Sequence, residues 1–456
     1  MHILERVRPG TRFAGPENIE LPAGYTIEPI VENLNYPSAV SWDADQNMLI
    51  AESGFTSGRW AQTEVRILRR DPGGALSTVA AGFEPPINDI TVAGGLLYVS
   101  HRGRISLVED GRIRDLITGL PSGGLHQNNA LVFGPDGRLY FGQGTVSNAG
   151  VVDSAALAQL HRTHQLAAHD LPGATVVLAG RNLPSRDPET GQTRMTGAFM
   201  PWGSPSQPGQ RIAGVRPGQA ASGSIMSARP DGSDLRVFAW GFRNPFGLVF
   251  GPGSRLFVTQ QGAQPLDPRP IFGDVDTLWV VDEGGWYGWP DFYGGTPVTD
   301  LDNTPLEFLL TNHAELLGNR KAPPRPVMDL GQVGVGKLDF CLHPEFGFAH
   351  QAFVAEFGPL LPPSASPEPC LPLGHRIVRI DLEQGSISDF CINRSRMPAS
   401  MRGNSGGLER PIEAKFGPDG NLYIVDFGIV EYRQELGDWL ATAETGIVWR
   451  VARTGF

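Results

Sequence analysis

The sequence is poor in lysine and in long apolar runs. Its 456 residues include 37 Lys and Arg, yet the only lysines are Lys321, Lys337 and Lys415. The 48 acidic residues give a formal net charge of -11, which disfavours nucleic acid or an anionic membrane as a partner because both attract basic patches. No apolar run approaches the roughly 20 residues that a membrane helix needs, so we expect no membrane insertion.

Cysteine is also scarce. Cys341, Cys370 and Cys391 are too few for a disulfide framework, and their spacing fits no metal motif. We expect three buried free thiols, with one bridge and one leftover thiol as the alternative. The first 25 residues lack the apolar stretch of a signal peptide, so either the protein stays inside the cell or a leader is missing.

Turn residues, in contrast, are abundant, with 58 Gly and 39 Pro spread along the chain. A turn of the Pro-Asp-Gly type recurs, each time followed by a short apolar strand with a polar or glycine exit. Asp-Gly before alternating hydrophobics is a strong hairpin signal, because Gly accepts the positive φ of a tight turn. The copies lie at 41–53, 91–103, 132–144, 249–262, 341–358 and 415–428.

A second hairpin follows each copy, and the last copy stops one strand short. These hairpins lie at 65–80, 103–117, 223–239, 276–285 and 375–391, and the final strand at 446–453. Six double hairpins predict an all-β fold, a six-bladed β-propeller of four-stranded antiparallel blades. We expect the early strand at 25–34 to complete the last blade and close the ring, which leaves no long unpaired edge.

The domain organisation follows from this repeat. Residues 1–24 are predicted to form an N-terminal extension and 25–456 the propeller, with loop and short-helix insertions at about 148–222 and 291–336. The stretch 154–170 has the composition of a short helix. Its His161 and His164, with His169 nearby, fit exposed helix histidines better than a metal or haem site, because no cysteine or carboxylate completes a ligand set.

Several stretches resemble a known family. The ordered combination of LPSGGLHQ at 120–127, FRNPFGL at 242–248 and YGWP at 287–290 is similar to the signatures of soluble pyrroloquinoline quinone (PQQ)-dependent glucose, sorbosone and aldose sugar dehydrogenases. The resemblance implies oxidation of an aldose-type sugar by hydride transfer to PQQ, with calcium beside the cofactor. It also implies an external electron acceptor and a periplasmic or secreted location.

The resemblance assigns roles to three polar side chains. His126 falls where the family has the base that takes the proton from the sugar hydroxyl, and an imidazole suits this because its ordinary pKa lies near 6.5. Arg243 and Asn244 match the pair that contacts the cofactor's oxygens, where a guanidinium would stabilise developing negative charge. The alternatives are a loop histidine that caps a turn and an Arg-Asn turn that ties one blade to the next.

For the metal, the resemblance points to backbone rather than side chains. Gly262 and Ala263 align with the two carbonyls that bind calcium in the family, and calcium readily accepts carbonyl oxygen. Asp274 and Asp276 either add negative charge nearby or simply begin the following strand.

Tyr287 and Trp289 are expected to form a rigid aromatic turn facing the central channel, although core packing is equally plausible. Arg410 lies near the place where the family presents cofactor-binding arginines.

Three departures from the family pattern concern charge. Leu125 stands where the glucose dehydrogenases have an aspartate before the base, and 355–370 has no basic residue where the family has a lysine. Only Arg410 lies near a position where several arginines are expected. Arg376 or Lys337 could compensate, because each charged hydrogen bond lost to a PQQ carboxylate costs about 1.5–3 kcal/mol.

Two other classes of function remain open on sequence grounds. The first is a propeller that works as a binding module without cofactor. The second is a calcium-dependent hydrolase of the lactonase kind, for which the candidate residues are Asn88, Asp89, Asn128, Asn129 and Asp426.

Overall fold

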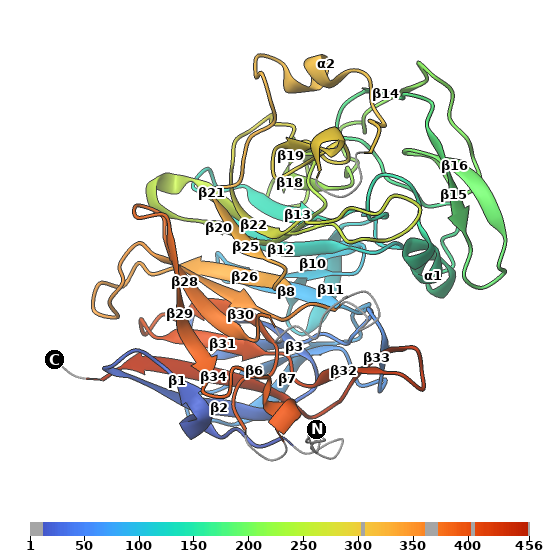
Figure 1. Ribbon diagram of the computed structural model, residues 1–456. Helices are drawn as coiled ribbons and strands as arrows, with labels where there is room; N and C mark the ends of the chain where they lie inside the picture. The colour runs from blue at the N-terminus through green and yellow to red at the C-terminus, as the bar shows by residue number, and fades with distance from the viewer. Residues whose placement is uncertain (1–11, 302–305, 361–372, 403–405, 455–456) are drawn as a thin grey trace.

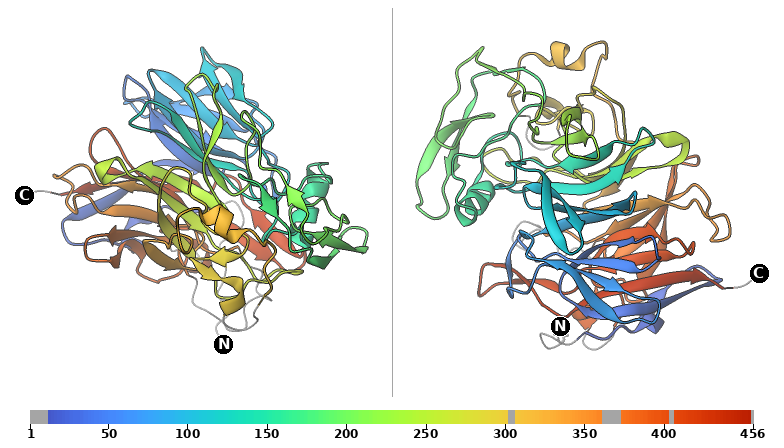
Figure 2. Two further views of the ribbon diagram at one scale, coloured as in Figure 1. Left: turned by 90° about the horizontal axis from the view of Figure 1, so that it is seen from above. Right: turned by 180° about the vertical axis from the view of Figure 1, so that it is seen from behind.

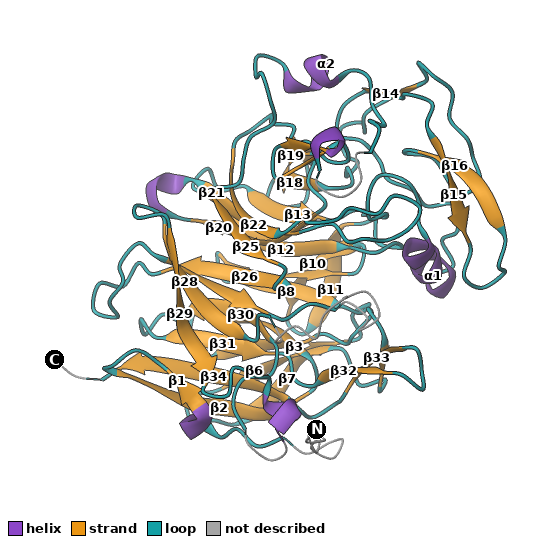
Figure 3. Ribbon diagram, viewed as in Figure 1, coloured by secondary structure: helices purple, strands orange, loops and turns teal. Residues whose placement is uncertain are grey.

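The computed structural model describes residues 12–301, 306–360, 373–402 and 406–454 (Figure 1). Strands dominate it, and helices are few and short (Figure 3). The all-β prediction is therefore confirmed. In the described part of the chain, no helix is both long enough and apolar enough to cross a membrane.

Three large antiparallel sheets are built from the first half of the chain, and in each the strands follow one another outward from the first. The first sheet is β3 (Pro37–Trp42), β4 (Met48–Glu52), β6 (Arg66–Arg70) and β7 (Leu76–Ala81). The second is β8 (Ile87–Ala93), β9 (Leu96–His101), β10 (Arg104–Glu109) and β11 (Arg112–Ile117). The third is β12 (Asn128–Phe133), β13 (Leu139–Gln143), β18 (Ser224–Ala228) and β19 (Arg236–Trp240).

Three more large sheets are built mainly from the second half, and two of them include a strand from the start of the chain. The fourth is β20 (Asn244–Phe250), β21 (Leu256–Gln261), β22 (Asp276–Val281) and β25 (Met328–Gly331). The fifth is β26 (Val335–Phe340), β27 (Ala352–Glu356), β28 (Arg376–Asp381), β29 (Ser386–Asn393) and the short β1 (Ile19–Glu20). The sixth is β30 (Pro411–Phe416), β31 (Leu422–Asp426), β34 (Gly446–Arg453) and β2 (Tyr25–Leu34), so the strand at 25–34 pairs with the last strand of the chain.

Each large sheet packs its apolar face against the next sheet in chain order. Ile67 of the first sheet and Val99 of the second, for example, share one buried cluster. Similar clusters join each later pair of sheets. A further cluster joins the sixth sheet to the first, with Val448 beside Val40. Alternating apolar residues on both faces of each sheet are thus buried between layers.

Hydrogen bonds also link neighbouring large sheets, in five cases between their first strands and in one case from Thr259 of β21 to β26. These bonds run from Ser38 Oγ to the Ile87 carbonyl (2.6 Å), from Asn88 Nδ2 to the Asn128 carbonyl (2.7 Å), from Asn129 Nδ2 to the Pro245 carbonyl (2.9 Å), from Thr259 Oγ1 to the Gly336 carbonyl (2.7 Å), from the Phe416 amide to Asp339 Oδ2 (2.9 Å) and from the Val40 amide to Glu413 Oε2 (2.7 Å).

The insertions differ in part from the prediction. Within 148–222 lie α1 (Ser154–Arg162) and two small hairpins, β14 (Val176–Val177) with β17 (Arg211–Ile212) and β15 (Asn182–Arg186) with β16 (Thr193–Gly197). Figure 2 shows this region, drawn in green, projecting beyond the body of sheets. The helix predicted over 154–170 ends at Arg162, where Thr163 caps it.

The second insertion lies earlier than predicted, at 282–327 between β22 and β25, and the hairpin predicted at 276–285 is wrong. Strand β22 does not turn back on itself; it pairs with β25, which lies inside the range 291–336. The intervening residues hold β23 (Phe292–Tyr293), β24 (Thr296–Pro297) and α2 (His313–Leu317). A long excursion between two paired strands leaves no local turn signal, so the sequence pattern could not locate β25.

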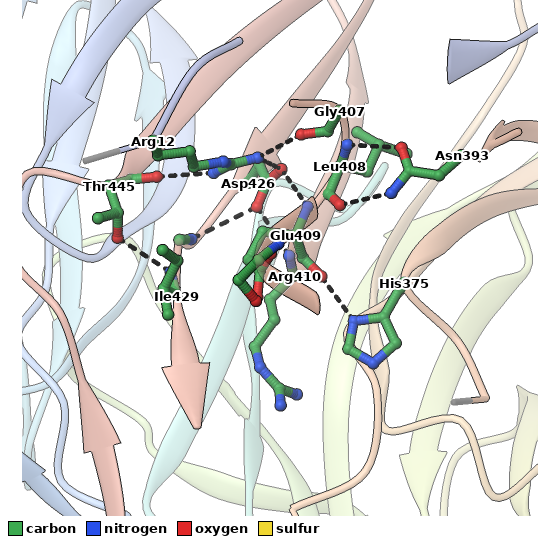
Figure 4. Close-up of polar contacts among 12 residues, drawn as sticks. Arg12, His375, Asn393, Gly407, Leu408, Glu409, Arg410, Asp426, Ile429 and Thr445 are labelled. Carbon is green, nitrogen blue, oxygen red and sulfur yellow. Dashed lines mark hydrogen bonds and ion pairs between the residues drawn. The ribbon is translucent and has the colours of Figure 1, made fainter. Parts of the chain in front are cut away.

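The segment before β2 is part of the packed body. Strand β1 extends the fifth sheet by pairing with β29. The guanidinium of Arg12, 3% exposed, forms an ion pair with the fully buried carboxylate of Asp426 on β31 (Figure 4). It also donates to the carbonyls of Thr445 (2.6 Å) and Gly407 (2.8 Å). Residues 1–11 of the predicted extension 1–24 lie outside the described residues.

Two of the three cysteines can be compared with the expectation. Cys341 and Cys391 are free and buried. Cys370 lies outside the described residues.

The Arg12–Asp426 pair generates a stability prediction. Arg12→Ala should lower the free energy of unfolding by about 3–5 kcal/mol, because it leaves an uncompensated buried carboxylate. Denaturant unfolding measures this. The matched control is Arg396→Ala, which removes an ion pair to Glu20 whose two side chains are each 48% exposed and which should cost about 0–1 kcal/mol. Equal losses in the two variants would contradict the prediction.

Candidate functional site

A cavity of about 460 Å³ opens where the first strands of all six large sheets begin. This volume lies in the range of small-molecule sites, which is about 300–1,000 Å³. The residues that the six strands contribute to its wall include Ser38, Asn88, Asn129, Asn244, Gly336 and Ile412. The loops that enter these strands therefore converge on one site although they are far apart in the sequence.

Backbone irregularities mark the same end of the six strands. In every large sheet the register between the first and second strands shifts within the first residues, for example between Asn128 and Leu131 and between Pro245 and Gly247. Such β-bulges re-aim side chains and are common beside functional sites. The backbone carbonyls of Ile87, Asn128, Pro245 and Gly336 lie at these shifts, and each accepts a hydrogen bond from a side chain of another sheet.

His126 lines this cavity, in the loop between the second sheet and β12. Its Nδ1 lies 3.0 Å from the carbonyl oxygen of Thr145 and 3.2 Å from Thr145 Oγ1. A carbonyl can only accept, so Nδ1 carries the hydrogen. The Thr145 hydroxyl itself donates to the Ser147 carbonyl (2.7 Å), which leaves its oxygen free to accept. Nε2 of His126 is consequently the unprotonated nitrogen.

The surroundings of His126 keep its imidazole neutral. Burial, followed by the nearby positive charge of Arg243, holds the pKa of His126 well below its ordinary value. The hydrogen bond to Thr145 opposes this shift only in part. At neutral pH the ring is therefore an uncharged base with a defined tautomer.

Arg243 lines the same cavity and is almost fully buried. Its backbone carbonyl accepts from the Thr145 amide (3.0 Å), so one residue contacts both His126 and Arg243. Its Nε donates to Asn148 Oδ1 (3.1 Å), which also accepts from the Gln264 amide (3.0 Å). The prediction that His126 and Arg243 face one cavity is consistent with these contacts.

Asn244 is fixed beside them by amide groups. Its Oδ1 accepts from Asn129 Nδ2 (2.7 Å), and its Nδ2 donates to Gln261 Oε1 (2.8 Å). Gly144 packs directly against this pair: a Cβ at that position would lie 2.3 Å from His126 Cβ and 2.5 Å from Asn244 Oδ1. Only glycine leaves room for both side chains.

Gly262 and Ala263 form part of the cavity wall, with two carboxylates behind them. The Gly262 amide donates to Asp276 Oδ1 (2.8 Å) and the Ala263 amide to Asp274 Oδ2 (2.6 Å). Burial raises the pKa of Asp274 to about 7. No donor among the described residues is bonded to the carbonyl oxygens of Gly262 or Ala263. Two free carbonyls beside two carboxylates suit a hard cation such as Ca²⁺.

Tyr287 and Trp289 do not reach the cavity. Tyr287 stacks on Phe242 with ring centroids 4.3 Å apart, and Trp289 donates through Nε1 to the Asn148 carbonyl (3.2 Å). Both are buried in apolar clusters, so the expectation that they face the channel is wrong and the core-packing alternative holds. The aromatic part of the wall comes instead from Phe55, Phe246, Phe357, Phe427 and Trp439.

The basic residues expected to hold a cofactor are largely used elsewhere. The Arg410 guanidinium points away from Asp426 (Figure 4) and donates to the carbonyls of Val430, Phe357 and Gly358. Arg376 is paired with Glu356 and Asp389. Lys337 is buried and paired with Asp89 and Glu413. Among the described residues of the wall, only Arg162 and Arg243 carry a guanidinium or ammonium group.

The residues considered for a hydrolase site are not assembled. Asn88 and Asn129 line the cavity, but Asp89 and Asp426 are neutralised by Lys337 and Arg12, and the Asn128 amide is bonded to Ser100 and nearby carbonyls.

Of the histidines expected to be exposed on one helix, only His161 lies on α1, and its side chain is 16% exposed. His161 contacts Asp187 (3.0 Å) and Glu189 (3.2 Å). Within the described ranges, no group of three His, Cys, Asp or Glu side chains is placed to hold a metal.

Sequence reasoning missed Thr145, Asn148, Asp153 and Asp170. All are buried; Thr145 and Asn148 follow the end of β13, Asp153 is the N-cap of α1, and Asp170 lies after α1. The only sequence signal was the polar run GTVSN at 144–148, where a blade would otherwise continue.

Comparison with known proteins gives one curated relative and several similar structures. Over 305 residues the chain is 25% identical to quinoprotein glucose dehydrogenase B of Acinetobacter calcoaceticus, a match that covers 58% of this chain. The chain spans about half (52%) of the length of that relative. No protein-family model matches the chain.

The solved structures share the fold over nearly the whole chain. The PQQ domain of pyranose dehydrogenase from Coprinopsis cinerea, in its holo form, has a TM-score of 0.58 at 13% identity and covers 95% of this chain and 97% of its own. The PQQ-bound aldose sugar dehydrogenase from Streptomyces coelicolor has a TM-score of 0.53 at 15% identity and covers 95% and 100%. The resemblance seen in the sequence motifs is thus confirmed, and the fold is that of these dehydrogenases.

The close contact at Gly144 leads to a prediction for the wall. Gly144→Ala should lower the free energy of unfolding by about 1–3 kcal/mol, because the new methyl group overlaps His126 and Asn244. Denaturant unfolding again provides the measurement. Gly73→Ala is the control, since Gly73 lies in an exposed turn and its Cβ would come no closer than 3.3 Å to Asp71 Oδ1. A Gly144→Ala protein as stable as this control would contradict the geometry.

Proposed function

We propose that this protein is a PQQ-dependent dehydrogenase that oxidises an aldose-type sugar inside the axial cavity, with calcium beside the cofactor. The observation that carries the proposal is that the same cavity wall holds a neutral imidazole, whose Nε2 has no bonded partner among the described residues, and a buried guanidinium. The curated relative, a quinoprotein glucose dehydrogenase by name, and the two PQQ-containing sugar dehydrogenase structures described above support it.

The proposed architecture is a closed six-bladed propeller over 25–456, with β2 completing the last blade. Two observations support closure. Apolar clusters link each large sheet to the next and the sixth to the first. Hydrogen bonds between neighbouring sheets make the same circuit: Thr259 of β21 links the fourth sheet to the fifth, and the Val40–Glu413 bond links the sixth sheet to the first.

The residues of the wall fit the cofactor in several respects. The cavity volume suits a small planar molecule, and five aromatic side chains supply apolar surface. Arg243 and Asn244 would contact its oxygens, and the carbonyls of Gly262 and Ala263 would bind calcium. Calcium would offset the negative charge of Asp274 and Asp276. Arg162 is the other cation of the described wall; it contacts Asp438 (3.3 Å) at the wall and would in addition face a cofactor carboxylate in place of the family's lysine.

Each residue of the wall would have a separate role in the reaction. When bound, PQQ supplies a two-electron acceptor for the hydride that leaves the sugar carbon. His126 Nε2 accepts the proton of the hydroxyl on that carbon, and Thr145 holds the ring so that this nitrogen faces the cavity. Arg243 stabilises the negative charge that the transfer places beside it. An external electron acceptor would complete the cycle. A periplasmic or secreted location remains a prediction.

The strongest competing function is a binding module without cofactor. A titration separates the two: purified protein with calcium should bind PQQ stoichiometrically, as followed by quinone absorbance, and then reduce a dye with an aldose as donor. A chelator should weaken PQQ binding, because calcium would no longer balance the carboxylates at the wall. Absence of saturable PQQ binding would remove the dehydrogenase proposal and leave the binding module.

The role of His126 predicts a specific pH dependence. A base with a depressed pKa stays unprotonated as pH falls, so at saturating calcium kcat/KM should stay level through pH 6.5, the ordinary histidine value, and decrease only below it. His126→Gln should lower kcat by about 10²–10⁴-fold.

The control for this variant is PQQ affinity, measured by the same absorbance titration, which should stay close to that of the unchanged protein. Full activity of His126→Gln, or an acidic limb centred at or above pH 6.5, would refute the base assignment.

A further inference from the structure

The insertion that begins near residue 148 returns to the cavity wall through a buried carboxylate. Asp170 is 2% exposed and lies well after α1 in the chain. Its Oδ1 accepts from the Val146 amide (2.7 Å), and its Oδ2 accepts from the Ser147 amide (3.1 Å) and from the Ser147 hydroxyl. One side chain thus holds two consecutive amides of the segment that follows β13.

This segment is the one that orients His126. Ser147, held by Asp170, accepts through its carbonyl from the Thr145 hydroxyl (2.7 Å). Thr145 in turn accepts from His126 Nδ1 through its carbonyl (3.0 Å) and contacts it through its hydroxyl (3.2 Å). The contacts therefore form an unbroken chain from Asp170 to the imidazole.

A second carboxylate of the insertion supports the other half of the wall. Asp153, the N-cap of α1, accepts from the Asn148 amide (2.8 Å) and the Ala156 amide (2.9 Å). Asn148 then accepts from Arg243 Nε (3.1 Å). The four residues 145–148 are accordingly held from the insertion at Val146, Ser147 and Asn148.

From these contacts we propose that Asp170 is a positioning residue: it fixes the segment 145–148 so that Thr145 holds His126 in the Nδ1–H tautomer, with Nε2 free. The insertion is then a frame for the base as well as a wall of the cavity. The role of His126 as base rests on the proposed function above, whereas its orientation by Asp170 does not.

The test is Asp170→Asn, which keeps the size of the side chain but replaces one acceptor oxygen by an NH₂ group facing an amide donor. The readout is the ¹⁵N chemical shifts of selectively labelled histidine, with the His126 signals assigned from the spectrum of His126→Gln. The unchanged protein should show the Nδ1–H tautomer at His126, and Asp170→Asn a mixture of tautomers. Turnover with PQQ should show kcat lowered by about 10–100-fold, with KM and PQQ affinity within about twofold, because a 1 Å misplacement can cost about 10² in rate.

The matched control is Asp187→Asn. Asp187 is an equally buried carboxylate of the same insertion, but it binds the Glu189 amide (2.9 Å) and Thr190 Oγ1 (2.9 Å), away from 145–148. It should leave the His126 shifts and kcat unchanged. Should Asp170→Asn fold poorly, Ser147→Ala removes one donor to Asp170 and should shift the tautomer in the same direction.

An unchanged His126 tautomer in folded Asp170→Asn would overturn the inference, as would an equal change in Asp187→Asn. The tautomer is measured without cofactor, so it decides the inference even if the protein does not bind PQQ. That second result would count against the proposed function alone.

Discussion

The structure depends on how the backbone amides and carbonyls of the six first strands find hydrogen-bond partners at the end where these strands surround the cavity. A regular ladder would pair every amide within its own sheet, but each first strand carries a register shift at this end. Buried amides and carbonyls left by these shifts must find other partners, because an unpaired buried polar group costs about 1–3 kcal/mol. Side chains of the neighbouring sheet supply them, for example Asp89 for the Leu131 amide and Glu413 for the Val40 amide. The same bonds therefore satisfy the backbone of one sheet and fix the next.

Charge beneath the cavity obeys a similar constraint. Asp89 and Glu413 accept backbone amides from adjacent sheets, which places two carboxylates in the buried centre. Lys337 lies between them, 2.7 Å from Asp89 and 3.3 Å from Glu413. A lysine in this position stabilises the scaffold, because removing it would leave both buried carboxylates without a positive partner. For this reason it cannot replace a missing cofactor ligand, although the sequence left that role open.

The sequence predicted the repeat well because each turn and strand carries local signals. The Pro-Asp-Gly turns and the strands that follow them lie where expected, and His126, Arg243 and Gly262 lie on one cavity. Strand β25 could not be predicted, because its partner β22 ends more than forty residues earlier in the chain and no turn links them. Tyr287 and Arg410 show another limit: an aromatic ring or a guanidinium suits a core, a backbone contact or a ligand equally well. Only the packing decides among these.

The supporting residues were missed for a related reason. Thr145 and Asp170 act through backbone groups, and the side chain of Asn148 is placed by a backbone contact to Asp153, so their effect depends on the course of the chain and not on a motif. The sequence raised a difficulty at Leu125, where an orienting carboxylate was expected and an apolar residue is found. The structure places the orienting group at Thr145 instead, as a carbonyl and a hydroxyl.

A neutral acceptor fixes the tautomer without adding negative charge, so burial and Arg243 remain free to depress the pKa of His126. The ring is a weaker base than one paired with a carboxylate, but it stays unprotonated over a wider range of pH. The carboxylates that would have raised its pKa lie one step further out, at Asp170 and Asp153, where they hold backbone and do not touch the imidazole.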